Sequence, residues 1–382
     1  MGNKFICMTN KDSRNGGIGS KSKRASRRSS LDEELLHRQA LAMAIQQHQL
    51  SQRFDNGSMS RRIGSTSSRR RPTNLSDPFP NTNNKQLSPE SLENIKTKKV
   101  VLVHGEGFGA WCWYKNIALL EESGLVPVAV DLTGSGIDLT DINNVATLTE
   151  YSKPLIDFLE KLAEDEKVIL VGHSSGGACI SYALEHFAEK ISKAVYVCAT
   201  MISDGQRAFD VFAEELGCAQ LFSSDSKSLI YGNGKDKPPT GYVFEKQQMH
   251  GLYFNQTPAK VGRRKKQGLG LGSGSGSAAA YLGLIEMLFH FQDVALAMVS
   301  MRGIPLGPMM EKLSLSAEKY GNGRRFYIQT LDDHALSPDV QEKLVRENPP
   351  QGVFKIKGSD HCPFFSKPHS LHKILIEIAQ IP

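Results

Sequence analysis

The feature that most constrains the fold of this chain is the pentapeptide at residues 172–176, with the sequence GHSSG. The apolar run 168–171 before it predicts a buried strand, and the small residues from Gly177 predict the start of a helix. A serine in the pattern G-x-S-x-G lies on a sharp strand-to-helix turn, where a glycine two positions away on each side relieves crowding. The pattern therefore predicts a nucleophilic hydroxyl on Ser174 at the carboxyl end of a parallel strand.

Short apolar runs alternate with amphipathic stretches from residue 98 onward. This alternation predicts an α/β fold with a mostly parallel central sheet and helices on both faces. Strands are expected at residues 100–104, 126–131, 168–171, 194–197, 326–329 and 353–356. Helices are expected at residues 111–123 and 148–163, from about 177, from about 337, and at 371–379. The interval of about 200–310 interrupts the pattern, and it is long enough for a helical cap over the carboxyl edge of the sheet.

The chain divides into a basic extension, residues 1–97, and a globular domain, residues 98–382. The extension carries a net charge of +9 and is rich in Ser, Arg and Asn, whereas the globular domain sums to −3. Apart from residues 31–50 the extension lacks the periodicity that a packed element needs, so we expect it to be disordered. Because the excess positive charge belongs to the extension, we infer no nucleic-acid partner from it.

The composition of the extension favours a plastid transit peptide, although eight acidic residues are more than such segments usually carry. A lipid anchor is the first alternative, with myristate on Gly2 and palmitate on Cys7, but Ile6 stands where the motif has Ser or Thr. A plain cytoplasmic tail is the second alternative. The sequence has no run of about 20 apolar residues, so we expect no membrane-spanning helix.

Residues 261–292 fit neither of the neighbouring patterns. They begin with a basic run, continue through repeated Gly-Ser and end in an aromatic-rich stretch. The simple interpretation is a flexible loop followed by a short helix. The alternative is a translated intron, because a Val codon begins with GT and Phe-Gln can be encoded by TTTCAG. Sequencing the transcript across this segment distinguishes the two.

A serine nucleophile needs a general base and a carboxylate that orients the base. The last two expected strands are followed by Asp332-Asp333 and by Asp360-His361. The carboxyl ends of parallel strands meet at one edge of the sheet, where active sites gather. We therefore expect His361 as the base and Asp333, in preference to Asp332, as the acid. Asp360 is expected to hydrogen-bond the backbone of its own turn.

The glycine-rich loop after the first strand, residues 104–113, faces the Ser174 turn and is a candidate source of a second oxyanion donor. An alternative is a dinucleotide-binding loop. Gly105, Gly107 and Ala110 satisfy G-x-G-x-x-A, and Asp131 stands where a ribose-binding acid would. We disfavour this alternative because it leaves the serine, aspartate and histidine turns unexplained. A fluorescence titration with NAD(P)H tests it.

From about residue 98 to residue 382 the chain resembles the plant methylesterases, a group of α/β-hydrolases related to hydroxynitrile lyases. Motifs around six positions carry the resemblance: His104-Gly105, Trp111, Asp131, Ser174, Asp333 and Asp360-His361. The resemblance implies an α/β-hydrolase fold, a catalytic triad of Ser174, Asp333 and His361, and an oxyanion hole formed by the backbone amides of Glu106 and Ser175. The long basic extension resembles that of the methylesterases assigned to chloroplasts.

The resemblance also implies an activity. We expect a carboxylic ester hydrolase that cleaves methyl esters of small acids, such as methyl indole-acetate, methyl jasmonate or methyl salicylate, through an acyl-enzyme. Hydroxynitrile lyases carry a Thr at the position of Gly105 and a Lys after the catalytic histidine, where this chain has Cys362. The lyase activity is therefore a disfavoured alternative. No cofactor or metal is expected, and the six cysteines show no metal-ligand spacing and are typical of free thiols in a reducing compartment.

A third alternative is a small-molecule binding protein that keeps the hydrolase fold and has little or no turnover. It is favoured by the carboxylate of Glu106 beside the expected oxyanion hole and by the segment 261–292 inside the cap. We expect substrate contacts at Gly105 and at apolar cap residues, with packing of the cap core as the competing interpretation; the cap candidates are Phe212, Leu221, Tyr242 and Leu252. The oligomeric state stays open, with a homodimer among the options.

Overall fold

The computed structural model describes residues 95–216, 227–257 and 292–382. Its central sheet has six parallel strands in the order β2-β1-β3-β4-β8-β9. The expected parallel sheet is therefore present, and each expected strand corresponds to one of these six. Their bounds are β1 Lys99–Val103, β2 Val126–Val130, β3 Val168–His173, β4 Ile191–Val197, β8 Arg325–Thr330 and β9 Gly352–Ile356.

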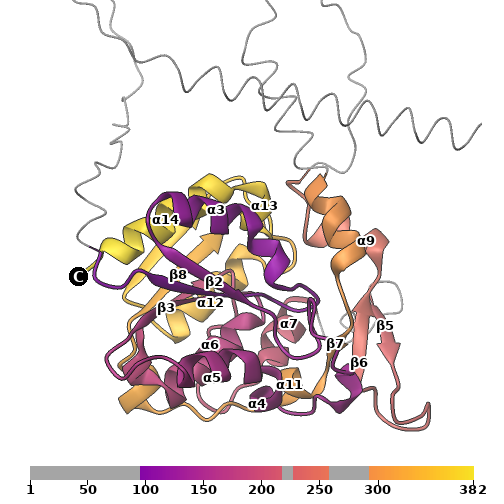
Figure 1. The fold of residues 1–382 in the computed structure, drawn as a ribbon. Helices are drawn as coiled ribbons and strands as arrows, with labels where there is room; N and C mark the ends of the chain where they lie inside the picture. The colour runs from indigo at the N-terminus through magenta and orange to yellow at the C-terminus, as the bar shows by residue number, and fades with distance from the viewer. Residues whose placement is uncertain (1–94, 217–226, 258–291) are drawn as a thin grey trace, which may run out of the picture. The chain divides into compact units, whose positions relative to one another are not determined.

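Helices cover both faces of the sheet (Figure 1). Apolar side chains of α3 and α14 pack on one face, and those of α5, α6 and α12 pack on the other. The expected helix at 148–163 is broken at Ser152 into two. The bounds are η1 Ala110–Trp113, α3 Tyr114–Glu122, α4 Leu148–Tyr151, α5 Lys153–Glu160, α6 Gly176–His186, α12 Pro338–Glu347, α13 Pro363–Ser366 and α14 Pro368–Gln380.

The central strand β3 shows why its sequence is almost continuously apolar. Every residue of Val168–His173 is buried. Ile169 and Val171 belong to the hydrophobic cluster under α3 and α14, whereas Leu170 belongs to the cluster on the opposite face. Because successive side chains of a strand point to opposite faces, a strand covered on both sides needs apolar residues at every position.

The cap contains helices, as expected, and also a three-stranded antiparallel sheet in the order β5-β6-β7 that the sequence analysis did not predict. The strands β5 and β6 place Lys227, Tyr242 and Phe244 in buried positions. A helical stretch at residues 292–300 completes the described part. The bounds are α7 Ala208–Leu216, β5 Lys227–Ile230, β6 Gly241–Phe244, α9 Lys246–Leu252, β7 Ile304–Pro305 and α11 Gly307–Met310.

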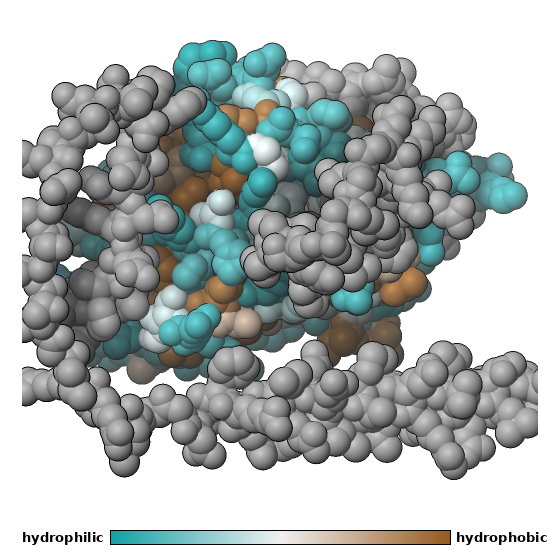
Figure 2. Space-filling model, turned by 90° about the horizontal axis from the view of Figure 1, so that it is seen from above, coloured by the Kyte–Doolittle hydropathy of each residue, from teal (hydrophilic) through white to brown (hydrophobic). Residues whose placement is uncertain are grey.

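Several expectations fall on residues outside the described part of the chain. They are the disorder of the extension, its role as a transit peptide or lipid anchor, the interpretation of residues 261–291, and the cap candidate Leu221. Among the described residues, no helix is long and apolar enough to cross a membrane. On the face shown in Figure 2, the described residues are mostly hydrophilic, with hydrophobic residues in smaller groups between them.

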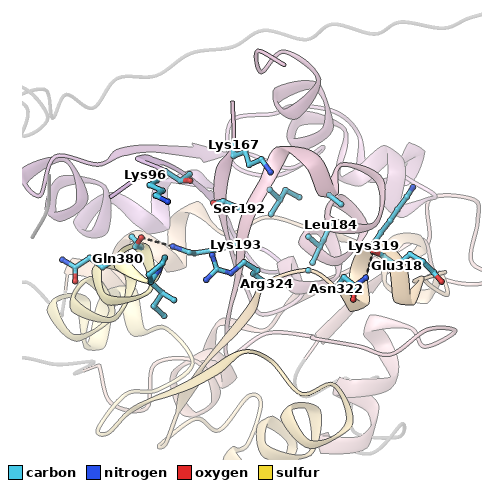
Figure 3. A pocket seen from close by; sticks show the side chains of 17 residues that line it. Lys96, Lys167, Leu184, Ser192, Lys193, Glu318, Lys319, Asn322, Arg324 and Gln380 are labelled. Carbon is cyan, nitrogen blue, oxygen red and sulfur yellow. Dashed lines mark hydrogen bonds between the residues drawn. The ribbon is translucent and has the colours of Figure 1, made fainter. Parts of the chain in front are cut away.

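A cavity of 570 Å³ lies at the amino ends of the strands, the edge opposite the Ser174 turn (Figure 3). Among the described residues that line it, the acidic side chain is Glu318, and the basic side chains are Lys96, Lys167, Lys193, Lys319 and Arg324. The ammonium group of Lys193 donates to the carbonyl of Ala379 in the last turn of α14, at 2.9 Å. A cation at this position is favourable because the last carbonyls of a helix carry partial negative charge. Burial, and then the nearby Arg324, lower the pKa of Lys193 to about 8.

Candidate active site

Ser174 lies on the turn between β3 and α6, in the strained backbone conformation that the pentapeptide predicts. Its φ angle is +52°, in the left-handed region that costs energy for a residue with a side chain. The neighbouring glycines are required by space: a Cβ on Gly172 would lie 2.9 Å from the carbonyl oxygen of Gly176, and one on Gly176 would lie 2.5 Å from the carbonyl oxygen of His104. Only small residues therefore allow this turn to form.

The structure brings Ser174, His361 and Asp333 into one hydrogen-bonded series. The His361 Nε2 atom lies 2.8 Å from the Ser174 Oγ atom, and its Nδ1 atom lies 2.8 Å from the Asp333 Oδ2 atom. All three side chains are buried. They come from the turns after β3, β8 and β9, so three distant stretches of sequence meet at the carboxyl edge of the sheet. This is the geometry of a nucleophile, a base and an orienting acid.

Asp333, and not Asp332, faces His361. The second oxygen of Asp333, Oδ1, accepts hydrogen bonds from the backbone N–H groups of Ala335 and Leu336, both at 2.9 Å. The Oδ2 atom also accepts from the hydroxyl of Thr330 at 2.9 Å. The Asp332 carboxylate instead accepts the N–H of Gly358 at 2.7 Å. Asp333 is thus held as an acceptor for the imidazole N–H.

Two opposing effects act on the pKa of His361. Burial disfavours the charged imidazolium, but the Asp333 carboxylate, through its charge and its hydrogen bond, favours it, and the pKa of His361 lies well above the usual value. An orienting carboxylate therefore stabilises the imidazolium that forms when the histidine accepts a proton.

The expected oxyanion hole contains an internal carboxylate. The Glu106 Oε2 atom accepts from the Ser175 N–H at 3.3 Å and from the Ser174 hydroxyl at 3.2 Å, and its Oε1 atom accepts from the Tyr253 hydroxyl at 2.8 Å. Burial would raise the pKa of Glu106, but Ser175, His361, its own backbone N–H and Tyr253 together hold that pKa below the usual value. The two amides that the family resemblance implies as oxyanion donors, those of Ser175 and Glu106, therefore face the Glu106 carboxylate.

An aromatic series extends from His361 into the cap. The ring of Tyr253 meets that of His361 edge to face at 4.7 Å, and Phe244 and Tyr242 follow at centroid separations of 5.1 and 5.6 Å. The ammonium group of Lys227 lies 4.4 Å from the centroid of the Tyr242 ring. The rings of Tyr253, Phe244 and Tyr242 form an aromatic wall, to which Tyr242, one of the predicted substrate contacts, belongs.

Of the other predicted substrate contacts, those that the structure describes lie in different parts of the fold. Gly105 abuts the nucleophile, since a Cβ there would lie 2.7 Å from the Ser174 Cβ atom. Leu252 is partly buried and packs on the core cluster that includes Phe108. Phe212 lies in α7, which packs against α11 and α12. Leu221 lies outside the described residues.

Three residues near the site were missed or underrated from the sequence. No sequence pattern indicates a role for Tyr253 or Lys227, because neither belongs to a motif. Asp360 was expected to bond only its own turn. It does so through the Cys362 N–H at 3.1 Å, but its other oxygen accepts from the Gln256 N–H at 3.0 Å and the Thr257 hydroxyl at 2.9 Å. Asp360 therefore ties the cap to the loop that carries His361.

Groups that could bind a dinucleotide or a metal make other contacts in this structure. Asp131 accepts the Ala110 N–H at 2.7 Å, so its carboxylate anchors the loop after β1. Within the described residues, one group of metal-ligand type is clustered: His173, Cys198 and His361. Both ring nitrogens of His361 are already used by Ser174 and Asp333, and the His173 Nε2 atom contacts the His361 carbonyl at 2.7 Å. A metal ion would have to break the Ser174–His361–Asp333 series.

Comparison with known proteins agrees with the fold. A profile of the alpha/beta hydrolase family matches residues 100–373, and the six-stranded sheet with a serine on the β3–α6 turn is the architecture of that class. Two proteins of Arabidopsis thaliana, named "Putative methylesterase 12, chloroplastic" and "Putative methylesterase 14, chloroplastic", are 65% and 66% identical, with 100% of both chains covered. The crystal structure of the Arabidopsis methylesterase protein MES16 matches with 31% identity and a TM-score of 0.59, covering 74% of this chain and 99% of that chain. The chain belongs to the plant methylesterase family.

Proposed function

We propose that this protein hydrolyses methyl esters of small carboxylic acids, with Ser174 as the nucleophile, His361 as the general base and Asp333 as the orienting acid. The single observation that carries the proposal is the hydrogen-bonded series of these three side chains, at 2.8 Å and 2.8 Å, on the turns after three parallel strands. Membership of the methylesterase family supports the choice of ester as substrate.

The proposed reaction proceeds in two halves. In the first, His361 Nε2 takes the Ser174 proton while the Oγ atom bonds to the ester carbonyl carbon. The tetrahedral intermediate collapses, the bond to the methoxy oxygen breaks, and His361 returns its proton so that methanol leaves. In the second half, His361 takes a proton from water, the hydroxide attacks the acyl carbon, and Ser174 regains its proton as the free acid departs.

The tetrahedral intermediate carries negative charge on its oxygen, which the backbone amides of Glu106 and Ser175 are proposed to stabilise. Loss of one such donor typically costs about 10²–10³-fold in rate. For the ester carbonyl to reach these amides, the Glu106 carboxylate has to leave them, because Ser175 donates to it at 3.3 Å in the free site.

The substitution Ser174→Ala tests the proposal. We expect formation of the free acid and methanol from a methyl ester to fall to the level of the uncatalysed reaction, with the fold retained because alanine is smaller than serine at a buried position. Both products should be quantified together by chromatography. Unchanged turnover of the Ser174→Ala variant would refute the role of Ser174.

The acid half of the substrate is proposed to be of the plant-hormone type, such as indole-acetate, jasmonate or salicylate. The support is the aromatic wall formed by Tyr253, Phe244 and Tyr242, which suits a flat or cyclic apolar acyl group. The test is a panel of methyl indole-acetate, methyl jasmonate and methyl salicylate, run on the chain with and without residues 261–292. Equal and very slow turnover of all three would argue against this substrate class.

A binding protein with weak turnover is the second candidate, and one observation favours it: the Glu106 carboxylate occupies the Ser175 amide. Burst kinetics with p-nitrophenyl acetate separate the two, since a binding protein releases p-nitrophenol neither in a burst nor in steady state. The lyase alternative is tested by cyanide release from mandelonitrile. The lyase activity lacks support at position 362, where the family's lyases carry a lysine and this chain has the buried thiol of Cys362.

We further propose a plastid location, with the extension as transit peptide. The support is that the relatives matching the full chain are named chloroplastic. A fusion of residues 1–97 to a fluorescent protein tests it against the lipid-anchor alternative, because Gly2→Ala abolishes myristoylation and leaves a transit peptide functional.

A further inference from the structure

The Glu106 carboxylate takes the place that the proposed chemistry needs for the substrate carbonyl oxygen. Its two oxygens accept three hydrogen bonds, from Ser174, Ser175 and Tyr253, and the side chain is only 2% exposed. A buried carboxylate with this set of donors is well stabilised as an anion. The free site therefore already holds a negatively charged ligand of its own.

We propose that Glu106 is a built-in competitor for the oxyanion hole, which keeps Ser174 unreactive until its carboxylate leaves the Ser175 amide. The inference rests on the proposed function and adds a regulation of that same site. Two arrangements follow: a closed one, as in the structure, and an open one, in which the ester carbonyl replaces Glu106 at the amides.

The carboxylate also competes for the proton of the nucleophile. The Ser174 hydroxyl has one hydrogen and two acceptors within reach, the His361 Nε2 atom at 2.8 Å and the Glu106 Oε2 atom at 3.2 Å. A hydroxyl that donates to Glu106 does not present its proton to the base. Closure therefore blocks the binding of the carbonyl and lets Glu106 compete with His361 for the Ser174 proton.

A cation, the ammonium group of Lys227, can interact with the Glu106 carboxylate when this carboxylate leaves the Ser175 amide. Lys227 lies on the buried face of the cap sheet, over the rings of Tyr242 and Phe244, and within the described residues it forms no ion pair with a carboxylate. It is also within electrostatic range of Glu106. An unpaired ammonium group in an aromatic environment is costly and gains from an approaching carboxylate.

Other polar and ionisable groups also face Glu106. Direct contacts come from Ser174, Ser175 and Tyr253, and His361 stabilises the carboxylate through its charge. More distant electrostatic partners are His104, Tyr151 and Tyr242. The two tyrosines have pKa values above their usual range and are neutral near pH 7, and the pKa of His104 is lowered by burial. Lys227 is the cation on the cap side among these described partners.

The experiment measures how fast Ser174 becomes covalently modified, using p-nitrophenol release from diethyl p-nitrophenyl phosphate on the full chain. Glu106→Gln is nearly isosteric and removes the charge, and Glu106→Ala removes the competitor altogether. Because each hydrogen bond to a charged group is worth about a factor of ten or more, we expect both variants to react about 10- to 100-fold faster. Rates equal to or slower than that of the unmodified protein would overturn the inference.

Two further variants sharpen the result. Glu166→Gln makes the same chemical change at a partly exposed residue paired with Lys99, and should leave the rate unchanged. Lys227→Met should slow modification when Glu106 is present and have no effect in the Glu106→Gln background, since there is then no carboxylate to receive. An equal effect of Lys227→Met in both backgrounds would contradict the role of Lys227.

The phosphate reagent keeps this inference distinct from the proposed function. Faster modification of the Glu106 variants, without hydrolysis of any methyl ester, would support the competitor and refute the methylesterase proposal. Rapid methyl ester hydrolysis by the unmodified protein, together with slower modification of both Glu106 variants, would do the reverse. Thermal unfolding of each variant shows that the fold is retained.

Discussion

The carboxylate of Asp333 determines which nitrogen of His361 is free to act as a base. Asp333 Oδ2 accepts the Nδ1–H at 2.8 Å, which leaves Nε2 with its lone pair toward Ser174. Two backbone N–H groups, of Ala335 and Leu336, hold the carboxylate in place. At the scale of single residues, the site is therefore defined by hydrogen bonds that fix direction as well as distance.

The prediction at this scale concerns Asp333→Asn. The amide is isosteric, but its NH₂ group can donate to Nδ1 and thereby favour the opposite tautomer, with the proton on Nε2. We expect kcat for ester hydrolysis to fall by about 10³–10⁴-fold. The matched control is Asp332→Asn, whose carboxylate bonds Gly358 and not His361, and whose effect should be far smaller. Similar losses for the two variants would show that Asp333 has no special part.

At the scale of elements, buried polar contacts help to join the cap to the sheet. Asp360 accepts from the backbone of Gln256 and from the hydroxyl of Thr257, while its neighbour His361 belongs to the site. Burial raises the pKa of Asp360, against the hydrogen bonds that lower it. The cap and the histidine loop are thus mechanically joined.

The prediction at this scale concerns Thr257→Val, which keeps the side-chain shape and removes one hydrogen bond to a buried carboxylate. We expect a loss of stability of about 1–3 kcal/mol and faster proteolysis of the cap, since a buried acceptor loses a donor. Urea unfolding and limited proteolysis measure the two effects. Thr149→Val removes an exposed hydrogen bond to Tyr182 and serves as the control, with an expected change below about 0.5 kcal/mol. Equal losses would mean that the Asp360 contact does not hold the cap.

The elements also show how far sequence alone could lead. The six sheet strands were predictable because each is a short apolar run between turn residues, and the G-x-S-x-G turn ordered them around Ser174. The cap sheet was not, because β6 and β7 pair across about sixty intervening residues and β7 is only Ile304–Pro305. The direction of the Glu106 side chain was also beyond the sequence, since it depends on Tyr253, which belongs to no motif.

At the scale of the whole molecule, buried charges make stability depend on pH. Burial lowers the pKa of Lys227 to about 8, against the usual value of 10.5 for a lysine. Between these two values the unfolded chain binds a proton that the folded chain does not, so the contribution of Lys227 to stability rises as pH increases from about 8 to about 10.5. Below pH 8 the folded protein bears the full cost of the buried ammonium.

The corresponding prediction is that Lys227→Met stabilises the protein at pH 7 by about 1–3 kcal/mol, because an apolar side chain of similar length replaces a buried cation. This gain should shrink at pH 9.5, where Lys227 is mostly neutral in the fold. Urea unfolding of both proteins at pH 7 and pH 9.5 measures it. If the two proteins differ in free energy of unfolding by the same amount at pH 7 and at pH 9.5, this would contradict a lowered pKa of Lys227 in the folded protein.

Intact-protein mass spectrometry with peptide mapping, after reaction with diethyl p-nitrophenyl phosphate, tests most directly whether Ser174 is the nucleophile of an ester hydrolase. We expect one diethylphosphoryl group per chain, on the peptide that contains Ser174, together with loss of methyl ester hydrolysis. Modification at another residue, or methyl ester hydrolysis that persists once Ser174 is fully modified, would contradict it.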